Sequence, residues 1–417
     1  MAETFKFLPL VLCSFLLSSC VSKEERVRLY EESVCSAKKV AVEQFVSALP
    51  RSVQVSQLFL VNIEGNRVFV PVEKVSSLYE NADLSEPLLP GGCLFFSYNV
   101  ADSKEKVSFF IDSINACYAK NANPPPFIAV DQEGGYVNRL RGITDSFPSE
   151  KFIAENLDEA AAKDLYEKQS LQMAELGFNM NLAPVVEPET PENASFLDTR
   201  SFGSQEKVLA YAPLEINAFE NRNIISVLKH FPGNSNTDPH TGLPEISVTK
   251  KQLEEEILAP FKKLLPLSSA VLMSHARIRP KDFSIEGLDS SVPACLSSFW
   301  VDRVLRQEWG YEGLVLSDDI FMGALADNGF SEEMAAVQAI EAGVNIIMLS
   351  EKRFAPVAKI LLKKAEESAE FAEKVKESVC RVIEAKIKKG LLKLKRIDLD
   401  ENGKSLKIPR FEVLALE

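Results

Sequence analysis

Short apolar runs recur along the chain, bounded by turn residues and separated by stretches whose apolar positions have helical spacing. The runs lie at residues 58–63, 93–96, 127–130, 180–186, 224–228, 270–273, 314–316 and 344–349. Near-continuous apolar strands that alternate with helices are typical of a parallel sheet covered on both faces, and eight such units close a (β/α)8 barrel. The sequence therefore predicts an α/β fold with one catalytic barrel domain over residues 55–395. A doubly wound open sheet is the alternative.

Polar residues follow several of these runs directly, which favours the barrel over the open sheet. Asp131, the pair Lys229 and His230, His275 and Asp318 each come just after an apolar run. The carboxyl ends of barrel strands converge on one face, where barrel active sites lie. We therefore expect one shared pocket at this face.

The segments that flank the barrel are predicted to be simple. Residues 21–54 are predicted to form a tether and a helix, with apolar residues at helical spacing from Glu24 to Arg51. Residues 366–394 indicate a long charged helix, and the tail over 396–417 is expected to be loosely ordered. We find no internal repeat of solenoid period and no second domain.

The first 20 residues have the pattern of a bacterial lipoprotein signal. Lys6 precedes the apolar run from Phe7 to Leu17, which is short for a membrane span but suits a signal peptide. Leu17-Ser18-Ser19-Cys20 resembles a lipobox, in which cleavage leaves the cysteine as an acylated first residue. We expect lipidation at Cys20 and a cell-envelope protein whose lipid anchor binds the membrane. The alternative is an uncleaved signal peptide with an incidental cysteine.

Charge and composition narrow the classes of partner and cofactor. The net charge of −13 and the pI near 5.1 argue against a broad basic surface for nucleic acid. The chain has three histidines and no CxxC spacing, so neither a metal site nor another cofactor is expected. The sequence does not indicate an oligomeric state.

Five motifs in order resemble family 3 glycoside hydrolases, in the branch of single-domain β-N-acetylglucosaminidases. They are FIAVDQEGGYVNRLRG at 127–142, GFNMNLAPVVEP at 177–188, TRSFGS at 199–204, VLKHFPG at 227–233 and GLVLSDDIFMGAL at 313–325. Any one motif is weak evidence, but five in this order are specific. The resemblance spans roughly residues 55–395. It implies a (β/α)8 barrel that hydrolyses terminal N-acetylglucosamine from glycans, with peptidoglycan turnover as the expected context.

The resemblance implies that Asp318 is the nucleophile. A carboxylate can attack an anomeric carbon and leave again when water hydrolyses the glycosyl ester. The alternative is that Asp318 only caps the N-terminus of a helix, since Ser and Asp favour that position. The two roles can also be divided between adjacent acids, with Asp318 facing the barrel mouth as the nucleophile and Asp319 capping the next helix.

The resemblance assigns acid/base catalysis to Asp238 and His240, an Asp-x-His pair after the fifth strand. Histidine can exchange a proton near neutral pH, and a neighbouring carboxylate can fix its tautomer. This loop also departs from the family, which usually has His-Gly where this chain has Asn234-Ser235. A smaller departure is Glu187, where the family more often has aspartate. These changes leave the placement of the catalytic pair open.

A sugar-binding set carries over from the same resemblance. Carboxylates can bind ring hydroxyls, and Arg and Lys supply donors to sugar oxygens. The alternative for the two arginines is an ordinary surface charge, whereas strand-end charges favour a pocket role. His275 either lines the pocket or is a hydrogen-bonded core residue. The set comprises Asp131, Arg139, Arg200, Lys229 and His230.

Two other functions remain compatible with the sequence. A neutral histidine does not repel phosphate as a carboxylate would, so the same scaffold could act as an N-acetylglucosaminide phosphorylase. The altered loop also leaves open a catalytically inactive glycan-binding lipoprotein. The presence of Asp318, Asp238 and His240 together argues for an enzyme, since a binding protein needs no nucleophile.

Overall fold

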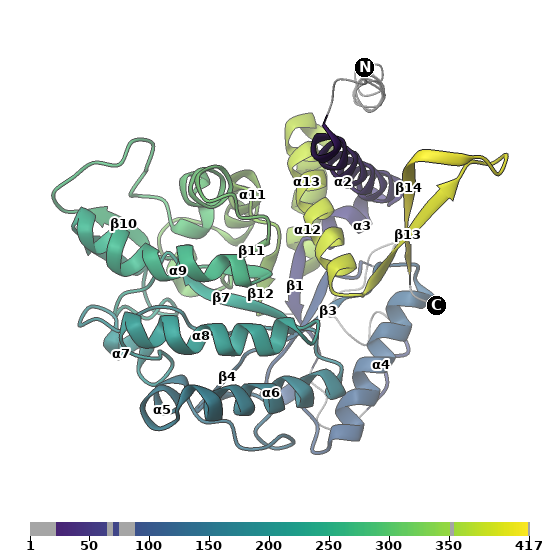
Figure 1. The fold of residues 1–417 in the computed structure, drawn as a ribbon. Coiled ribbons are helices and arrows are strands. Elements are labelled where there is room, and N and C mark those ends of the chain that lie inside the picture. Colours follow the sequence, from purple (N-terminus) through teal and green to yellow (C-terminus); the bar gives the residue numbers. More distant parts are fainter. Residues whose placement is uncertain (1–21, 65–69, 75–87, 351–353, 416–417) are drawn as a thin grey trace.

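The computed structural model describes residues 22–64, 70–74, 88–350 and 354–415. Within these ranges, eight parallel strands form one sheet in the order β11-β9-β7-β6-β3-β2-β1-β12 (Figure 1). A parallel bridge between Leu316 and Ile346 joins its two edges, so the sheet closes into a barrel. The strands are β1 (Phe59–Asn62), β2 (Gly92–Phe95), β3 (Phe127–Val130), β6 (Met180–Asn181), β7 (Ile225–Phe231), β9 (Ala270–Met273), β11 (Leu314–Ser317) and β12 (Ile347–Leu349).

The predicted barrel is confirmed, and each of the eight apolar runs overlaps one strand. The largest difference is at the fourth run, where β6 ends at Asn181 rather than continuing to Val186. Pro184 has no N–H to donate to a neighbouring strand. Pairing resumes only as an isolated bridge between Val185 and Lys229.

Strand side chains alternate between two separate cores. On β9, Ala270 and Leu272 belong to a cluster built from alternate residues of the barrel strands, whereas Val271 and Met273 pack in the larger cluster that includes the helices. This period of two places the first set inside the barrel and the second under the helical layer. Because both faces are covered, the strands are apolar throughout.

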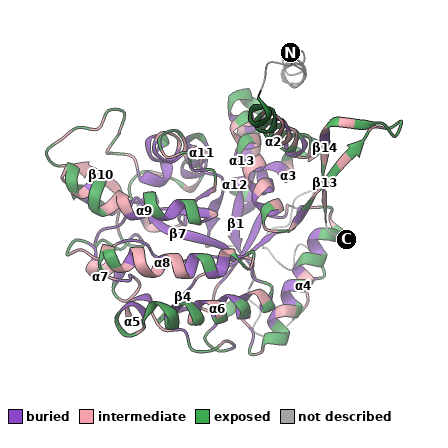
Figure 2. Ribbon diagram, in the orientation of Figure 1, coloured by how far each residue is buried: buried purple, intermediate pink, exposed green. Residues whose placement is uncertain are grey.

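Helices surround the barrel with their buried faces turned toward the sheet (Figure 2). Several begin at a Ser or Asp whose side chain accepts a hydrogen bond from the first turn, as at Ser103, Asp158 and Ser204. The main helices are α4 (Lys104–Lys120), α5 (Glu150–Asn156), α6 (Glu159–Leu176), α8 (Gln205–Glu220), α9 (Leu258–Leu264), α11 (Glu332–Ala342), α12 (Phe354–Glu367) and α13 (Ala369–Lys388). Shorter elements are α7 (Ala194–Leu197), α10 (Gly323–Ala326), η2 (Ser97–Asn99), η4 (Leu265–Leu267), η5 (Ala294–Leu296) and the π-helical η3 (Gln252–Ile257) and η6 (Phe299–Glu308).

Two small two-stranded sheets lie next to the strand ends that carry the polar residues. The antiparallel pair β4 (Gln132–Gly134) and β5 (Val137–Asn138) follows β3 directly. The parallel pair β8 (Glu245–Val248) and β10 (Arg277–Pro280) lies beyond the loops after β7 and β9.

The N-terminal part of the described chain is helical, as predicted. It forms α2 (Lys23–Ala48), followed by α3 (Arg51–Ser56). Cys20 and the rest of the predicted signal lie outside the described residues. Among the residues that the structure does describe, no helix has the length and apolarity needed to cross a bilayer.

The C-terminal tail is more ordered than the sequence predicts. It forms an antiparallel hairpin of β13 (Leu392–Leu399) and β14 (Ser405–Ala415) beside α2 (Figure 1). Lys38 of α2 lies over the Phe411 ring, 5.7 Å from its centroid. Leu392 and Val413 are buried, because the alternation of apolar and charged residues in this tail has the strand period.

A buried lysine lies where α13 meets the barrel. The Nζ of Lys386 donates to Gln57 Oε1 at 2.6 Å and lies 5.1 Å from the centroid of the Phe127 ring. Burial lowers the pKa of Lys386 to about 7. The folded protein therefore releases this proton at a lower pH than the unfolded chain does.

Replacement of this lysine should change how stability depends on pH. The cost of burying the charge is fully present below about pH 7 and is relieved as pH rises toward the ordinary lysine value. Above pH 7, the free energy of unfolding of Lys386→Met should therefore fall relative to that of the parent chain, by up to about 1.4 kcal/mol per pH unit. Urea unfolding of both proteins from pH 6 to 9 measures this. The exposed Lys388→Met is the control, and a pH-independent difference for Lys386→Met would contradict the prediction.

Candidate active site

A cavity of about 500 Å³ opens at the carboxyl ends of the barrel strands. Its volume suits a ligand of sugar size. Apolar walls come from Phe96, Phe196 and Phe321 among others. Of the eight catalytic and substrate-binding residues predicted from the sequence, all but Asp238 line it: Asp131, Arg139, Arg200, Lys229, His230, His240 and Asp318.

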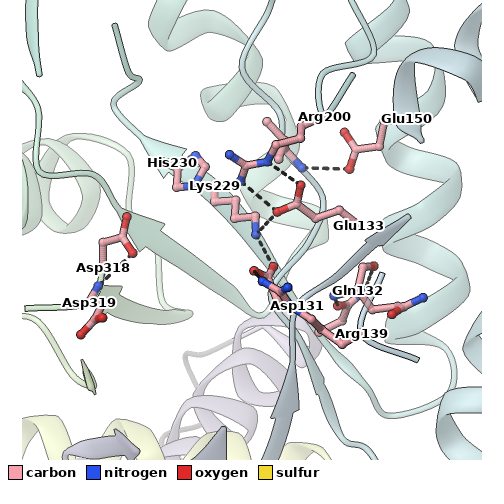
Figure 3. Close-up of polar contacts among 12 residues, drawn as sticks. Asp131, Gln132, Glu133, Arg139, Glu150, Arg200, Lys229, His230, Asp318 and Asp319 are labelled. Carbon is pink, nitrogen blue, oxygen red and sulfur yellow. Dashed lines mark hydrogen bonds and ion pairs between the residues drawn. The ribbon is translucent and has the colours of Figure 1, made fainter. Parts of the chain in front are cut away.

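A network of ion pairs organises one wall of the cavity (Figure 3). The Nζ of Lys229 lies 2.6 Å from Asp131 Oδ1 and 2.5 Å from Glu133 Oε1. Arg200 binds both oxygens of Glu133, at 2.7 and 2.9 Å, in the bidentate geometry that suits guanidinium and carboxylate. Arg139 Nη2 is 3.8 Å from Asp131 Oδ2. The network therefore joins the β3–β4 turn, the end of β7 and the segment after α7.

Glu133 is the functional residue that sequence reasoning missed. It is 1% exposed and does not line the cavity, but it fixes both Arg200 and Lys229. A signal was present, because Glu133 is a second carboxylate just after the same strand end as Asp131, within the motif FIAVDQEGGYVNRLRG. Burial alone would raise the pKa of Glu133, but Arg200 and Lys229 outweigh it and hold the pKa well below its ordinary value. The carboxyl group is therefore ionised.

The cationic partners respond in the opposite direction. Burial would lower the pKa of Lys229, but Asp131 and Glu133 outweigh it and raise the pKa above its ordinary value. Glu133 likewise raises the pKa of Arg200 against the effect of burial. Both cations stay charged although they are largely buried, and burial strengthens the attraction of their donors for sugar oxygens.

His230 is oriented by Glu187, the residue that departs from the family's aspartate. Its Nδ1 is 2.7 Å from Glu187 Oε1, and its backbone N–H donates to the same oxygen at 3.2 Å. A carboxylate accepts the hydrogen bond at this contact, so Nδ1 carries the hydrogen and Nε2 can bind a ligand. The Lys229–His230 peptide bond is cis, and both side chains line the cavity.

The two departures from the family pattern contact each other. Asn234 Nδ2 donates to Glu187 Oε1 at 3.2 Å, so Asn234 takes part in the same contact that orients His230. An amide is shorter than an imidazole, and glutamate is longer than aspartate. The altered loop therefore remains anchored to the cavity wall.

Asp318 and Asp319 diverge after β11, but Asp319 does not cap the next helix as predicted, because α10 begins after Met322 without a side-chain cap. Asp318 is 7% exposed, lines the cavity and accepts a hydrogen bond on Oδ1 from Asp319 N at 2.8 Å. Asp319 Oδ1 accepts from the backbone N–H groups of Phe321 and Ser350, at 3.1 and 3.0 Å. Burial raises the pKa of Asp319 despite these bonds. Asp319 thus holds the turn, and Asp318 faces the ligand space.

His240 and Asp238 form a pair on the cavity rim. His240 Nδ1 lies 2.7 Å from Asp238 Oδ1, and the side chains are 68% and 55% exposed. The backbone N–H of His240 donates to Asp238 Oδ1 at 2.9 Å, and this bond contributes most to lowering the pKa of Asp238. The pair leaves His240 Nε2 free to exchange a proton with a ligand.

His275 is a core residue rather than a cavity residue. Its Nε2 is 2.9 Å from the carbonyl oxygen of Asp319, and its Nδ1 is 3.1 Å from Cys295 Sγ. A carbonyl only accepts, so Nε2 carries the hydrogen and Nδ1 accepts from the thiol. His275 therefore supports the turn that carries the candidate nucleophile.

The comparison with known proteins decides the family. The model of the glycosyl hydrolase family 3 N terminal domain matches residues 53–385. The chain belongs to glycosyl hydrolase family 3. The resemblance noted in the sequence motifs is thus confirmed. Among the residues that the structure describes, this family 3 barrel has no group of three or more His, Cys, Asp or Glu side chains placed to hold a metal ion.

Individual relatives agree with this assignment. Beta-hexosaminidase A of Pseudoalteromonas piscicida is 29% identical over 274 residues, which cover 62% of this chain but only 45% of that protein. A beta-hexosaminidase of Alkalilimnicola ehrlichii is 30% identical over 302 residues, covering 70% of this chain and 79% of that protein. A family 3 beta-N-acetylglucosaminidase from Paenibacillus sp. has a similar solved structure, with a TM-score of 0.71 at 27% identity; 82% of this chain and 63% of that chain are covered.

Two further buried carboxyl groups lie behind the ion-pair network of this family 3 barrel. Glu150 of α5 accepts from Val185 N at 3.2 Å. Within the described part of the chain, its Oε2 has no hydrogen-bond partner, and neither oxygen of Glu215 on α8 has one. Burial, and then the charge of Glu133, raises the pKa of Glu215 well above its ordinary value. Burial and Glu215 do the same for Glu150. These glutamates therefore favour the neutral form, in contrast to Glu133.

Because Glu133 is ionised and Glu215 favours the neutral form, a change from glutamate to glutamine should have opposite effects on stability at these two sites. Glu133→Gln should destabilise the protein by about 3–5 kcal/mol, because it leaves Arg200 and Lys229 without a buried counter-charge. Glu215→Gln should stabilise it at pH 8 by about 1 kcal/mol or more, since the raised pKa means that the carboxyl group is costly to ionise in the folded state but not in the unfolded chain, and the amide has no such cost. This gain should shrink toward pH 5. Urea unfolding at both pH values measures each variant, and equal losses for the two would contradict the prediction.

Proposed function

We propose that this chain is a retaining β-N-acetylglucosaminidase that hydrolyses terminal N-acetylglucosamine from glycans. Family membership and the activities named for its relatives support a glycosidase of this type. The observation that carries the proposal is the shared cavity, in which the buried Asp318 and the rim residue His240 lie with the charged sugar-binding set. The glycans that we expect are fragments of peptidoglycan.

In the first step Asp318 attacks the anomeric carbon of the bound sugar. The bond from that carbon to the leaving oxygen breaks as a bond to the Asp318 carboxylate forms, through a transition state with oxocarbenium character. His240 Nε2 gives its proton to the leaving oxygen, and Asp238 at Nδ1 stabilises the imidazole's orientation. The products are the released aglycone and a glycosyl ester on Asp318.

In the second step the same groups act in reverse. Water enters the place of the aglycone, His240 Nε2 takes one of its protons, and the hydroxide attacks the anomeric carbon. The ester to Asp318 breaks and the carboxylate returns. Two inversions at one carbon retain the β configuration.

The ion-pair wall supplies the sugar contacts. Asp131 can accept from ring hydroxyls, while Lys229, Arg139 and Arg200 donate to sugar and acetamido oxygens. His230 Nε2 is presented to the same space because Glu187 holds Nδ1. These side chains are fixed before the sugar binds, so little ordering remains to be done on binding.

We also propose that the protein is anchored in the cell envelope through acylated Cys20. The supporting observation is the Leu17-Ser18-Ser19-Cys20 sequence after the apolar run. The first described helix, α2, begins at Lys23. An anchored enzyme would meet glycans at the membrane surface.

Asp318→Asn should abolish turnover while the fold is kept, because an amide cannot form the glycosyl ester. A 5-fluoro sugar substrate, whose intermediate breaks down slowly, should label the parent protein at Asp318, as peptide mass analysis would reveal. A label on Asp319 would overturn the assignment. Product analysis with and without inorganic phosphate distinguishes hydrolysis from phosphorolysis, since only the latter yields a sugar 1-phosphate.

His240→Ala should slow hydrolysis of natural glycans by about 10²- to 10⁴-fold, the usual effect of losing general acid/base catalysis. Nitrophenyl substrates should be spared in the first step, because nitrophenolate leaves without a proton. Azide, which needs no general base, should restore turnover of the trapped intermediate. Asp238→Ala should give a milder form of the same pattern. Equal losses on both substrates without azide rescue would move the role away from His240.

Cys20→Ser should abolish acylation and release the protein from membranes in a bacterial host. Two or three acyl chains anchor a protein stably where one chain does not, so the shift between fractions should be large. Metabolic labelling with a fatty acid analogue and fractionation measure it. Native protein that is unlipidated and begins before residue 20 would refute the anchor.

A further inference from the structure

The loop that carries His240 lies against the loop that carries Asp318. The backbone N–H of Ala324, at the start of α10, donates to the carbonyl of Pro239 at 3.1 Å. Pro239 is buried although its neighbours Asp238 and His240 are exposed. This contact therefore ties the exposed tip of one loop to the other.

Gly323 makes the close approach possible. A Cβ on Gly323 would lie 2.8 Å from the carbonyl oxygen of His240 and 3.7 Å from its carbonyl carbon. The nearer distance is below what real Cβ contacts show, and the atom it meets belongs to the backbone, so the loop itself would have to move. Gly323, Pro239 and His240 all line the cavity with Asp318.

The part of the loop that precedes Asp238 is held by contacts to residues 187–195. Asn236 accepts from Ser195 N at 2.9 Å and donates to the Pro191 carbonyl at 2.8 Å, and Asn234 donates to Glu187. These anchors precede Asp238, so they set the start of the loop. The Pro239–Ala324 contact sets the position of its tip, where the imidazole is attached.

We propose that Gly323 is a positioning residue for the acid/base step, because the absence of a side chain there lets the His240 backbone lie against the loop that carries Asp318, which keeps the imidazole at the rim of the cavity that Asp318 lines. The inference rests on the acid/base role proposed for His240. Proton transfer needs hydrogen-bond reach, and a displacement of about 1 Å can cost on the order of 10²-fold in rate.

Gly323→Ala tests the proposal with the smallest possible change. The backbone of Gly323 is not in the left-handed region, so alanine acts through the new contact rather than through strain. We expect kcat on natural glycans to fall by about 10- to 100-fold. The loss should be smaller on nitrophenyl substrates, and azide should partly restore their turnover. Gly142→Ala is the matched control and should leave all rates unchanged, because a Cβ there would meet no atom of the described residues within 4 Å.

A double-mutant cycle separates positioning from other effects. In the His240→Ala background, Gly323→Ala should cause no further loss, since the group it displaces is gone. The same loss in both backgrounds, or a rise in KM alone, would mean that the methyl group acts on the sugar or on Asp318, and would overturn the proposal. If His240→Ala shows no leaving-group dependence, the acid/base assignment fails and this inference fails with it.

A second variant covers the case in which Gly323→Ala does not fold. Ala324→Pro deletes the N–H that donates to Pro239, at a first-turn position of α10 where proline is tolerated. It should show the same leaving-group pattern and the same lack of additivity with His240→Ala. Thermal unfolding midpoints of all variants, compared with the parent, control for loss of structure. If Ala324→Pro folds and has parental rates on natural glycans, the Pro239–Ala324 hydrogen bond does not position the loop, and the proposal is contradicted.

Discussion

The ammonium of Lys229 is buried 2.6 Å from Asp131 and 2.5 Å from Glu133, and much of the site depends on this pairing. A buried charge is too costly to keep unless it is paired and hydrogen-bonded. Glu133 meets that requirement for Lys229 and for Arg200 at once. Because Glu133 does not line the cavity, its role is to place the residues that do.

Three glutamates on this side of the barrel show how partners decide charge. Glu133, Glu150 and Glu215 are all nearly inaccessible to solvent. Glu133 has two cations within hydrogen-bond distance, and its pKa is depressed. The other two have no cationic partner at that distance among the described residues, and burial raises their pKa values. Keeping them neutral avoids additional negative charge behind the network.

The candidate nucleophile and the candidate acid/base are held in contrasting ways. Asp318 is buried at a strand end, beside a turn fixed by Asp319 and by the His275 contact to the Asp319 carbonyl. His240 is exposed on a loop whose position depends on a few backbone and amide contacts. This arrangement suits a site in which the sugar end is enclosed and the leaving group departs toward solvent.

The sequence by itself determined the strands and the residues at their ends, because both depend on local patterns. Apolar runs with a turn at each end predict buried parallel strands, and a polar residue directly after a run then lies at the end of the barrel where active sites form. That reasoning placed Asp131, Lys229 and Asp318 in one cavity. The motifs added His240 and its partner Asp238 through resemblance.

Only the tertiary structure decided the contacts between distant segments. Arg200 meets Glu133 across 67 residues, and Asn234 meets Glu187 across 47, distances at which no local period carries information. The C-terminal hairpin also depends on packing, because β13 and β14 pair with each other and Leu392 and Val413 become buried only in the folded chain. The placement of His275 under Asp319, rather than in the cavity, likewise follows from packing, since a strand-end position alone allows either side.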